Sequence, residues 1–425
     1  MLAACGLSSL DDLFAHIPSS LTLDADLSIP DGLSEMELVA ELRRLAGRNR
    51  HMDELLCFAG GGAYDHYVPA VVWALAGRSE LYTSYTPYQP ELSQGVLQAL
   101  FEYQSMICEL TGLDVSNASL YDGPTALVEA AHMATAATGR SRVLVSEALD
   151  LRYRKTLATY GAGEHFTVET IGAQEGRTEV PQIGPDVAAV VVQNPNFFGN
   201  LDRPQEVFEA AAAGGARAIQ VFDPLSLGVL APPADVGADI AVAEGQVLGN
   251  HLNYGGPYLG VIAARTQDLR RMPGRIVGET TDVDGQRGYV LTLQTREQHI
   301  RRERATSNIC TNQTLMAVAA SVYLGWLGPR GLEELGRQCM AKARYTADRI
   351  SDLTPADLMW PDAAVFKEFA VRTPAEPREV QSRLLESGFL VGPVIGEDGL
   401  LVSVTERRTR EDIDLLVKAF GEAVS

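Results

Sequence analysis

Residues 187–193 read VAAVVVQ, and the polar turn NPN follows directly at residues 194–196. The first six positions of this run are all apolar, with no alternation between apolar and polar residues. A strand of this kind is typical of a parallel sheet that is covered on both faces. The stretch therefore predicts a central strand of an α/β fold.

Similar apolar runs occur on both sides of this strand. Each gap between two runs can hold one helix, and the clearest is Gln205–Ala213, which Gly214 and Gly215 close. Strands that alternate with helices predict a parallel sheet with helices on both faces. The other runs are Val143–Ser146, Phe166–Ile171, Ala218–Phe222, Asp239–Val242 and Leu259–Ala263.

The pattern changes towards both ends of the chain. Residues 1–60 read as an N-terminal arm with short helices at about 5–15 and 34–47, and residues 61–328 form the large domain. Residues 329–425 alternate helix and strand again, which predicts a small C-terminal α/β domain. Its expected elements are a helix over 331–352, the strand Phe366–Arg372, a helix over 377–387, the strand Leu400–Thr405, and a final helix that Thr409 and Asp412 cap.

Composition excludes several classes of protein. The chain has 425 residues, of which 46% are hydrophobic and 21% charged, as in a soluble globular protein. A net charge of −20 argues against nucleic acid or an anionic membrane as a partner. We find no secretory signal and no apolar run of about 18 residues. Five scattered cysteines without a CxxC pair favour free thiols in a reducing cytoplasm over disulfides or zinc, so we expect no metal site.

Several polar segments are candidates for binding. The turn 193–196 and Asp223 each follow a predicted strand, at the sheet edge where α/β proteins bind ligands. Asp223 before Pro224 could equally be a simple turn. Asp122–Thr125 precedes an Ala-rich helix, which is either an anion site or an ordinary helix cap. The glycine-rich segment 58–67 is more typical of a structural turn than of a phosphate loop.

Two further segments are rich in side chains that make contacts. Residues 82–91, YTSYTPYQPE, combine three tyrosines with two prolines, which favours a ligand or interface loop over core packing. Residues 278–315 gather Arg296, Arg301, Arg302 and Arg304 before the polar run Thr306-Ser307-Asn308. This second segment is either a solvated ion-pair surface or a set of donors aimed at an anion or a partner subunit.

Five segments together resemble one protein family, glycine dehydrogenase (decarboxylating), the P-protein of the glycine cleavage system. Within it, the chain is similar to the α, or N-terminal-half, subunits (subunit 1) of the split form. The resemblance implies the fold-type-I architecture of pyridoxal-phosphate (PLP) enzymes, with a large mainly parallel-sheet domain and a small C-terminal α/β domain. The segments are AYDHYVP (63–69), YTSYTPYQPELSQG (82–95), SNASLYDGPTAL (116–127), NYGGPYLG (253–260) and RGYVLTLQTREQHIRRERATSNICTNQ (287–313).

One residue that a PLP-carrying fold-type-I enzyme needs is missing from this chain. Fold-type-I enzymes hold PLP as a Schiff base on a lysine that follows the aspartate paired with the pyridine nitrogen. Asp223 stands at that aspartate position, but residues 241–254 contain no lysine. The resemblance therefore implies that PLP is held covalently by a lysine-bearing β subunit, and that this chain is not active alone. The chain's four lysines are Lys155, Lys342, Lys367 and Lys418.

The resemblance implies PLP-dependent decarboxylation of glycine, with transfer of the aminomethyl group to the lipoyl arm of H-protein. The expected partners are subunit 2 (β), in an α2β2 assembly, and lipoylated H-protein. Two alternatives remain open, a diverged paralogue acting on another small amino acid in a specialised pathway and a non-catalytic scaffold subunit. We expect two sets of residues to reach the partner's active site: Tyr85, Thr86, Tyr88, Gln89 and Glu91 in its cleft, and Thr306, Ser307 and Asn308 at the PLP phosphate or the lipoyl channel.

Overall fold

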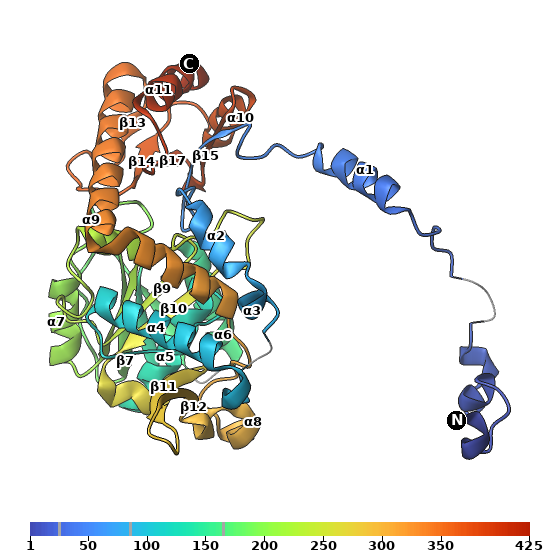
Figure 1. The fold of residues 1–425 in the computed structure, drawn as a ribbon. Coiled ribbons are helices and arrows are strands. Elements are labelled where there is room, and N and C mark those ends of the chain that lie inside the picture. Colours follow the sequence, from blue (N-terminus) through green and yellow to red (C-terminus); the bar gives the residue numbers. More distant parts are fainter. Residues whose placement is uncertain (24–26, 85–86, 164–165) are drawn as a thin grey trace. The chain divides into compact units, whose positions relative to one another are not determined.

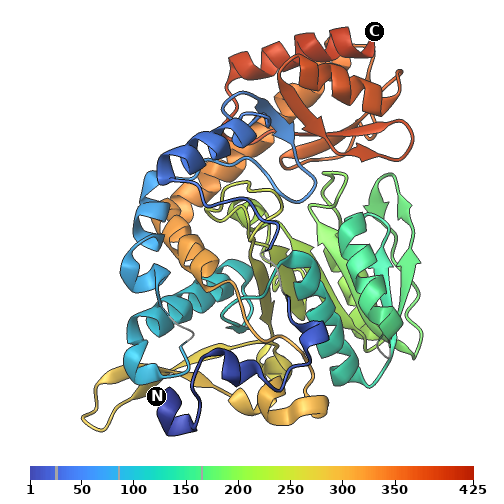
Figure 2. The same cartoon turned by 90° about the vertical axis from the view of Figure 1, so that its right-hand side faces the viewer.

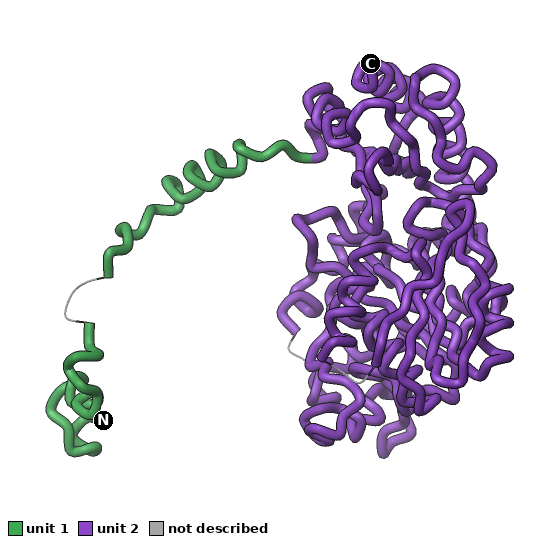
Figure 3. The backbone as a smooth tube through the Cα atoms, turned by 180° about the vertical axis from the view of Figure 1, so that it is seen from behind, with its two compact units in different colours: residues 1–51 green, residues 52–425 purple. Residues whose placement is uncertain are grey.

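In a computed structural model, the chain is described at residues 1–23, 27–84, 87–163 and 166–425. It divides into two compact units, Met1–His51 and Met52–Ser425 (Figure 3). The first unit contains the 3-10 helices η1 (Leu2–Cys5), η2 (Asp11–Phe14) and η3 (Ser19–Leu21), followed by the helix α1 (Glu35–Ala46).

The two helices expected in the arm differ in outcome. The second is confirmed as α1, where the Ser34 hydroxyl accepts a hydrogen bond from the Glu37 N–H and the Glu37 carboxylate accepts one from the Ser34 N–H. The first, expected at 5–15, is two short 3-10 helices instead. The Asp12 carboxylate accepts hydrogen bonds from the backbone N–H groups of Ser8 and Ser9, and such local bonds compete with a continuous helix.

The second unit is built on a seven-stranded sheet with the strand order β2-β10-β9-β8-β7-β3-β4 (Figures 1 and 2). The five strands from β9 to β4 are parallel, and β10 and β2 add antiparallel pairings at one side. The bounds are β2 Val115–Ser116, β3 Arg142–Ser146, β4 Thr167–Ile171, β7 Val187–Asn194, β8 Arg217–Phe222, β9 Ile240–Glu244 and β10 Gly260–Ala264.

Helices cover both faces of this sheet because its strands are apolar at successive positions. Val191 packs with α5 residues in one buried cluster, whereas Val190 and Val192 pack with α7 residues in another. The helices are α2 Ala70–Ala76, α3 Ser79–Tyr82, α4 Gln94–Thr111, α5 Gly123–Thr138, α6 Leu151–Gly163 and α7 Pro204–Ala213, with the 3-10 helices η4 Pro90–Leu92, η5 Pro224–Gly228 and η6 Thr266–Arg271.

All six predicted strands form, but two details of the predicted sheet are wrong. The strand predicted at Leu259–Ala263 becomes β10 and runs antiparallel to β9, because the glycine-rich connection 245–259 forms no crossover helix. The gap between β4 and β7 holds the hairpin β5 (Ala173–Gln174) and β6 (Arg177–Thr178) instead of a helix. The prediction of a mainly parallel α/β sheet is confirmed.

Residues 276–304 leave the sheet as a hairpin followed by three short helical turns. The hairpin pairs β11 (Ile276–Thr281) with β12 (Arg287–Thr292). The turns are η7 Gln294–Arg296, α8 Gln298–Arg301 and η8 Arg302–Arg304.

A second group of elements, called here the C-terminal layer, contains a four-stranded antiparallel sheet with the order β13-β14-β17-β16. The parallel pair β1–β15 and the helices α10 and α11 complete it. Leu56–Ala59, which the sequence assigned to the arm, forms strand β1 here. The bounds are β1 Leu56–Ala59, β13 Asp357–Leu358, β14 Glu368–Arg372, β15 Phe389–Gly392, β16 Val394–Ile395, β17 Gly399–Ser403, α10 Pro377–Glu386 and α11 Arg410–Val424.

The helix α9 (Thr314–Leu353) connects the large sheet to the C-terminal layer. It begins well before residue 331, where the sequence placed its start, and it is kinked at Gly328, which has a φ of 58°. Gly328 is the last residue of the expected large domain, although the domain boundaries themselves stay a prediction. Within the described ranges, neither α9 nor another helix is both long and apolar enough to cross a membrane.

The loop after β7 touches the C-terminal layer so closely that a side chain at Gly199 has no room. A Cβ built there would lie 1.9 Å from the Glu368 carbonyl oxygen, and Gly199 has a φ of +86°. We expect Gly199→Ala to destabilise the chain by about 3 kcal/mol or more, since conformational strain and a backbone clash add. Gly285→Ala is the matched control, because Gly285 has a φ of +78° but faces open space. Equal losses of melting temperature in the two variants would contradict the close approach.

Candidate functional site

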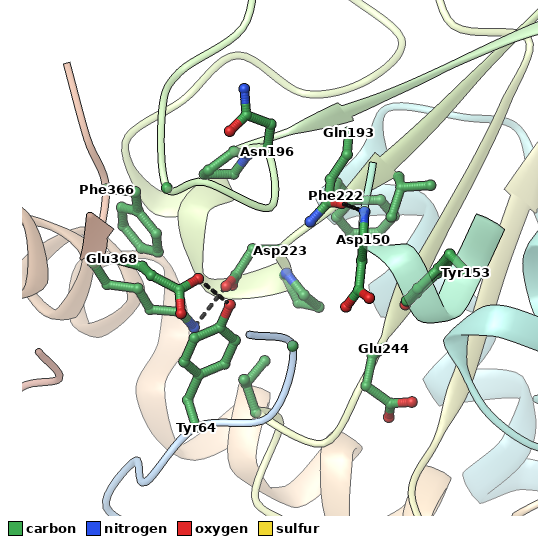
Figure 4. Close-up of a pocket in the computed structure, with 17 residues that line it drawn as sticks. Tyr64, Asp150, Tyr153, Gln193, Asn196, Phe222, Asp223, Glu244, Phe366 and Glu368 are labelled. Atoms are coloured by element: carbon green, nitrogen blue, oxygen red, sulfur yellow. Dashed lines mark hydrogen bonds and ion pairs between the residues drawn. The ribbon is translucent and has the colours of Figure 1, made fainter. Parts of the chain in front are cut away.

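A pocket lies at the edge of the sheet where the parallel strands end. Gln193, Asp223 and Glu244 lie at or just after the carboxyl ends of β7, β8 and β9, and Asp150 precedes α6. Figure 4 shows these side chains around one space, with Tyr64 and Glu368 facing them from the other side. The predicted positions of Asp223 and of the turn 193–196 at this edge are therefore confirmed.

A lysine from the C-terminal layer enters this pocket. The Lys367 ammonium nitrogen lies 2.6 Å from the Asp223 carboxylate, and the two side chains are 2% and 13% exposed. The same nitrogen lies 3.7 Å from the centroid of the Tyr64 ring, a cation–π contact. Asp223 Oδ1 also accepts a hydrogen bond from the Leu225 N–H. The carboxylate at the end of β8 is thus fully engaged by groups of the chain itself.

His66 continues this network towards the C-terminal layer. Its Nε2 lies 2.9 Å from the Lys367 ammonium, and its Nδ1 lies 2.6 Å from Glu406. Burial and the Lys367 ammonium lower the pKa of His66, so the ring is neutral and Nδ1–H donates to Glu406. His66, Glu406 and Cys339 are spaced closely enough to hold a metal ion, but the neighbouring ammonium group opposes a second cation there.

Glu368 sits beside Lys367 and is buried, and it forms no ion pair with another of the described residues. Its carboxyl group accepts hydrogen bonds from the Gly61 N–H (2.6 Å) and the Tyr64 hydroxyl (3.0 Å). Burial raises the pKa of Glu368 to about 7, although these two hydrogen bonds oppose the rise. The glycine-rich segment 58–67, read from the sequence as a structural turn, therefore also supplies part of the pocket.

Glu244 occupies the N-terminus of α5. Its carboxylate accepts hydrogen bonds of 3.0 Å from the backbone N–H groups of Gly123, Gln246 and Leu259. Gly123 is the first residue of α5, where helices attract anions. Burial raises the pKa of Glu244 to about 7, against the effect of these N–H donors. The anion position suggested by Asp122–Thr125 is taken by a carboxyl group of the chain.

The loops expected to reach the partner lie elsewhere. Tyr88, Gln89 and Glu91 are exposed, while Tyr85 and Thr86 lie outside the described residues. Thr306 and Asn308 are exposed, and Ser307 is half-buried, with its hydroxyl accepting a hydrogen bond from the Ile309 N–H. The structure includes none of these described residues in the lining of the pocket.

Arg275 joins the two loops. Its guanidinium is 5% exposed and donates to the Tyr88 hydroxyl (2.8 Å), the Cys310 carbonyl (3.1 Å) and Asn312 Oδ1 (3.1 Å). It also lies 4.9 Å from the centroid of the Tyr88 ring. The segments 87–91 and 307–313 are thereby held side by side, as one surface.

The arginine-rich segment shows little ion pairing. Arg296 is partly buried and donates to the carbonyls of Leu293 and Gly274. Arg301, Arg302 and Arg304 are exposed, and Arg304 lies 3.9 Å from Glu303. Exposed contacts of this length contribute little to stability, so a surface ion-pair network does not explain why these arginines cluster.

The sequence was compared with known protein families. A family model described as glycine cleavage system P-protein matches residues 1–420. The chain belongs to this family. It is 50% identical over 429 residues to the probable glycine dehydrogenase (decarboxylating) subunit 1 of Moorella thermoacetica, and the match covers 99% of this chain and 96% of that protein. The corresponding protein of Desulforamulus reducens is 48% identical over 431 residues, with coverage of 99% and 96%.

Solved structures agree with this P-protein assignment. A crystal structure of glycine decarboxylase (P-protein) of the glycine cleavage system, in inhibitor-bound form, superposes with a TM-score of 0.95 at 46% identity, covering 100% of this chain and 97% of that one. Sphingosine-1-phosphate lyase from Burkholderia pseudomallei has a TM-score of 0.70 at 16% identity, with coverage of 96% and 94%, which shows the fold alone. The predicted fold-type-I architecture is confirmed.

The fold implies PLP, but the residues of this P-protein chain do not fit the cofactor in their own pocket. Asp223 is already paired with a cation, and the N-terminus of α5 already holds Glu244. The remaining cavity is about 40 Å³, whereas ligand pockets occupy roughly 300 Å³ or more. No lysine lies between Asp223 and Tyr258. Lys367 contacts Asp223, so its amine takes the place of the pyridine nitrogen and not that of the reactive aldehyde.

Most of the polar residues of the pocket were missed at the level of sequence, among them Asp150, Glu244, Lys367, Glu368 and Tyr64. Lys367 and Glu368 lie in a predicted strand of the small domain, and Tyr64 lies in a segment read as a turn. One signal was present, because Lys367 is one of only four lysines and stands beside Glu368 at the start of a predicted strand. Its partner could not be named, since the two layers that meet here are far apart in the sequence.

Ionisation of Glu368 should make stability depend on pH. The carboxyl keeps its proton to about pH 7 in the folded chain, against an ordinary value of 4.5, so folding loses stability as the pH rises through this window. We expect Glu368→Gln to match the wild type at pH 5 and to exceed it by up to about 3 kcal/mol at pH 8.

Thermal melts between pH 5 and 8 measure this difference. Glu102→Gln, at an exposed position of α4, is the control and should show no growing advantage. A Glu368→Gln effect that is the same at every pH would contradict a buried carboxyl that ionises near neutrality.

Proposed function

We propose that this chain is the α subunit of a split glycine dehydrogenase (decarboxylating), and that PLP is held by the lysine of a partner β subunit. The observation that carries this proposal is the chain's own pocket, where Lys367 and Glu244 leave no place for the cofactor. The similarity to proteins called subunit 1 over nearly the whole chain supports a second subunit. The chain would then be inactive alone.

The reaction is decarboxylation of glycine with transfer of the aminomethyl group to the lipoyl arm of H-protein. When bound, PLP supplies a protonated ring that takes up the electron pair left by the departing carbon dioxide. This chain's part is to orient groups, exclude water and place hydrogen-bond donors at the partner's site. We propose an α2β2 assembly in the cytoplasm, and the free cysteines of the chain support a reducing compartment.

We assign these tasks to the surface formed by segments 87–91 and 307–313, which Arg275 holds side by side. Tyr88, Gln89 and Glu91 present exposed polar groups there, and Tyr85 and Thr86 belong to the same segment of sequence. These five residues would line the partner's cleft. Thr306, Ser307 and Asn308 offer hydroxyl and amide donors on the neighbouring segment, and these suit the phosphate of a cofactor. Arg275 supports the proposal by fixing both segments against each other.

Co-expression with the candidate β subunit tests the assignment. We expect a hetero-oligomer by size exclusion with light scattering, and glycine–bicarbonate exchange by the complex but by neither chain alone. Full exchange by the β subunit alone would reduce this chain to a scaffold. Exchange with another small amino acid in place of glycine would identify a diverged paralogue.

Loss of one hydrogen-bond donor to the phosphate should lower the affinity of the assembled enzyme for PLP. A hydrogen bond to a charged group is worth roughly 1.5–3 kcal/mol, so Ser307→Ala should raise the PLP concentration for half-maximal exchange about ten- to a hundredfold. Ser387→Ala, at the end of α10 in the C-terminal layer, is the control and should leave the requirement unchanged. An unchanged PLP requirement in Ser307→Ala would place residues 306–308 away from the phosphate.

A further inference from the structure

We propose that the pocket of this chain is an internal clamp. Lys367 and Glu244 stand where the two charged ends of a cofactor would lie, and the ion pair of Lys367 with Asp223 fastens the C-terminal layer to the large sheet. The pocket would then be a permanently closed structural element rather than an empty binding site. This inference concerns the chain's own fold, and it does not depend on which reaction the assembled enzyme performs.

The first step is the position of the cation. Asp223 ends β8 where a fold-type-I enzyme pairs its pyridine nitrogen, and here the Lys367 ammonium lies 2.6 Å away. The ammonium has further partners in His66 Nε2 at 2.9 Å and the face of the Tyr64 ring at 3.7 Å. A buried cation with a carboxylate, an imidazole and an aromatic face around it needs no external anion.

The second step is the position of the anion. Three backbone N–H groups, including that of the first residue of α5, donate to Glu244. The Tyr153 hydroxyl oxygen would lie 1.9 Å from a Cβ built on Gly123, so the same helix end is also crowded. A phosphate would have to displace the carboxyl group and would lie close to Asp150 and Glu368, which line the same pocket.

The third step is which parts of the chain these contacts join. Asp223 belongs to the large sheet, while Lys367 precedes β14 and Glu406 follows β17 in the C-terminal layer. His66, in the segment between β1 and α2, contacts both Lys367 and Glu406 and so supports the lysine from the side of the C-terminal layer. The α9 helix that links the layers is kinked at Gly328. The ion pair therefore joins the C-terminal layer to the large sheet at a place separate from the α9 connection.

A double-mutant cycle on the full chain tests the clamp. Losing one partner of a buried ion pair leaves the other uncompensated, so Lys367→Met and Asp223→Asn should each lower the melting temperature by about 5–10 °C. The double variant Asp223→Asn/Lys367→Met should lose clearly less than the two single losses combined, because it leaves no unpaired charge. Lys418→Met, at an exposed position of α11, is the control and should change little.

Hydrogen exchange shows whether the layers separate. In Lys367→Met, peptides covering residues 63–69 and 404–408 should exchange at least tenfold faster than in wild type, while peptides of α5 remain protected. In the double variant this acceleration should be smaller. Equal exchange in wild type and Lys367→Met, or losses of melting temperature that simply add, would overturn the clamp even if every variant folds.

Labelling with the cofactor is a third test of the clamp, after melting temperature and hydrogen exchange. Wild-type chain mixed with pyridoxal 5′-phosphate and reduced with borohydride should carry no stoichiometric label at Lys367, because that amine is buried and paired. A stoichiometric adduct at Lys367 would overturn the inference. Failure of the glycine–bicarbonate exchange would refute the proposed function but leave these stability and exchange results unaffected.

Discussion

The ion pair between Lys367 and Asp223 governs the charge balance of the pocket at the carboxyl ends of the parallel strands. Four acidic residues, Asp150, Asp223, Glu244 and Glu368, line this small space, and buried charges are costly unless they are paired or hydrogen-bonded. Each of these four carboxyl groups is stabilised by different partners. Asp150 pairs with Arg152 and Asp223 with Lys367, Glu244 accepts three backbone N–H bonds, and Glu368 lies between Gly61 and Tyr64.

Under the proposed function, the same pair limits how the chain can take part in catalysis. A fold-type-I subunit that carries PLP needs a free carboxylate for the ring nitrogen and a free anion site, and here both are already engaged. We therefore propose that this chain's contribution to the reaction lies outside the pocket. The packed pocket then has a structural role, and it supports the part of the chain that carries the exposed segments 87–91 and 306–308.

Those outward-facing groups depend on a second buried cation. Arg275 is almost fully buried, and among the described residues it forms no ion pair with a carboxylate. Its donors go to Tyr88, Cys310 and Asn312, so its role is to hold two polar loops together. A planar guanidinium suits this task, because its donors point in fixed directions. The positions of Tyr88 and of the 307–313 segment are consequently coupled.

The sequence by itself determined six of the seven strands of the large sheet, the α/β class and the family. Val187–Gln193 and the runs beside it are apolar at successive positions, and this property depends only on local sequence and on burial of both sheet faces. Asp223 and the turn 193–196 could be placed at the sheet edge for the same reason, since strand ends of a parallel sheet meet. The final helix followed from Thr409 and Asp412, whose capping contacts are local.

Only the tertiary structure decided what occupies that edge. Lys367 reaches Asp223, and Arg275 reaches Tyr88, through contacts between segments far apart in the chain, and no local pattern encodes such pairs. The antiparallel direction of β10 likewise depended on a connection, residues 245–259, that forms no helix. The sequence could show that no lysine stands at the position where a PLP-carrying fold-type-I enzyme would have one. Folding brought a different lysine to the aspartate, and their pairing offsets the cost of burying either charge.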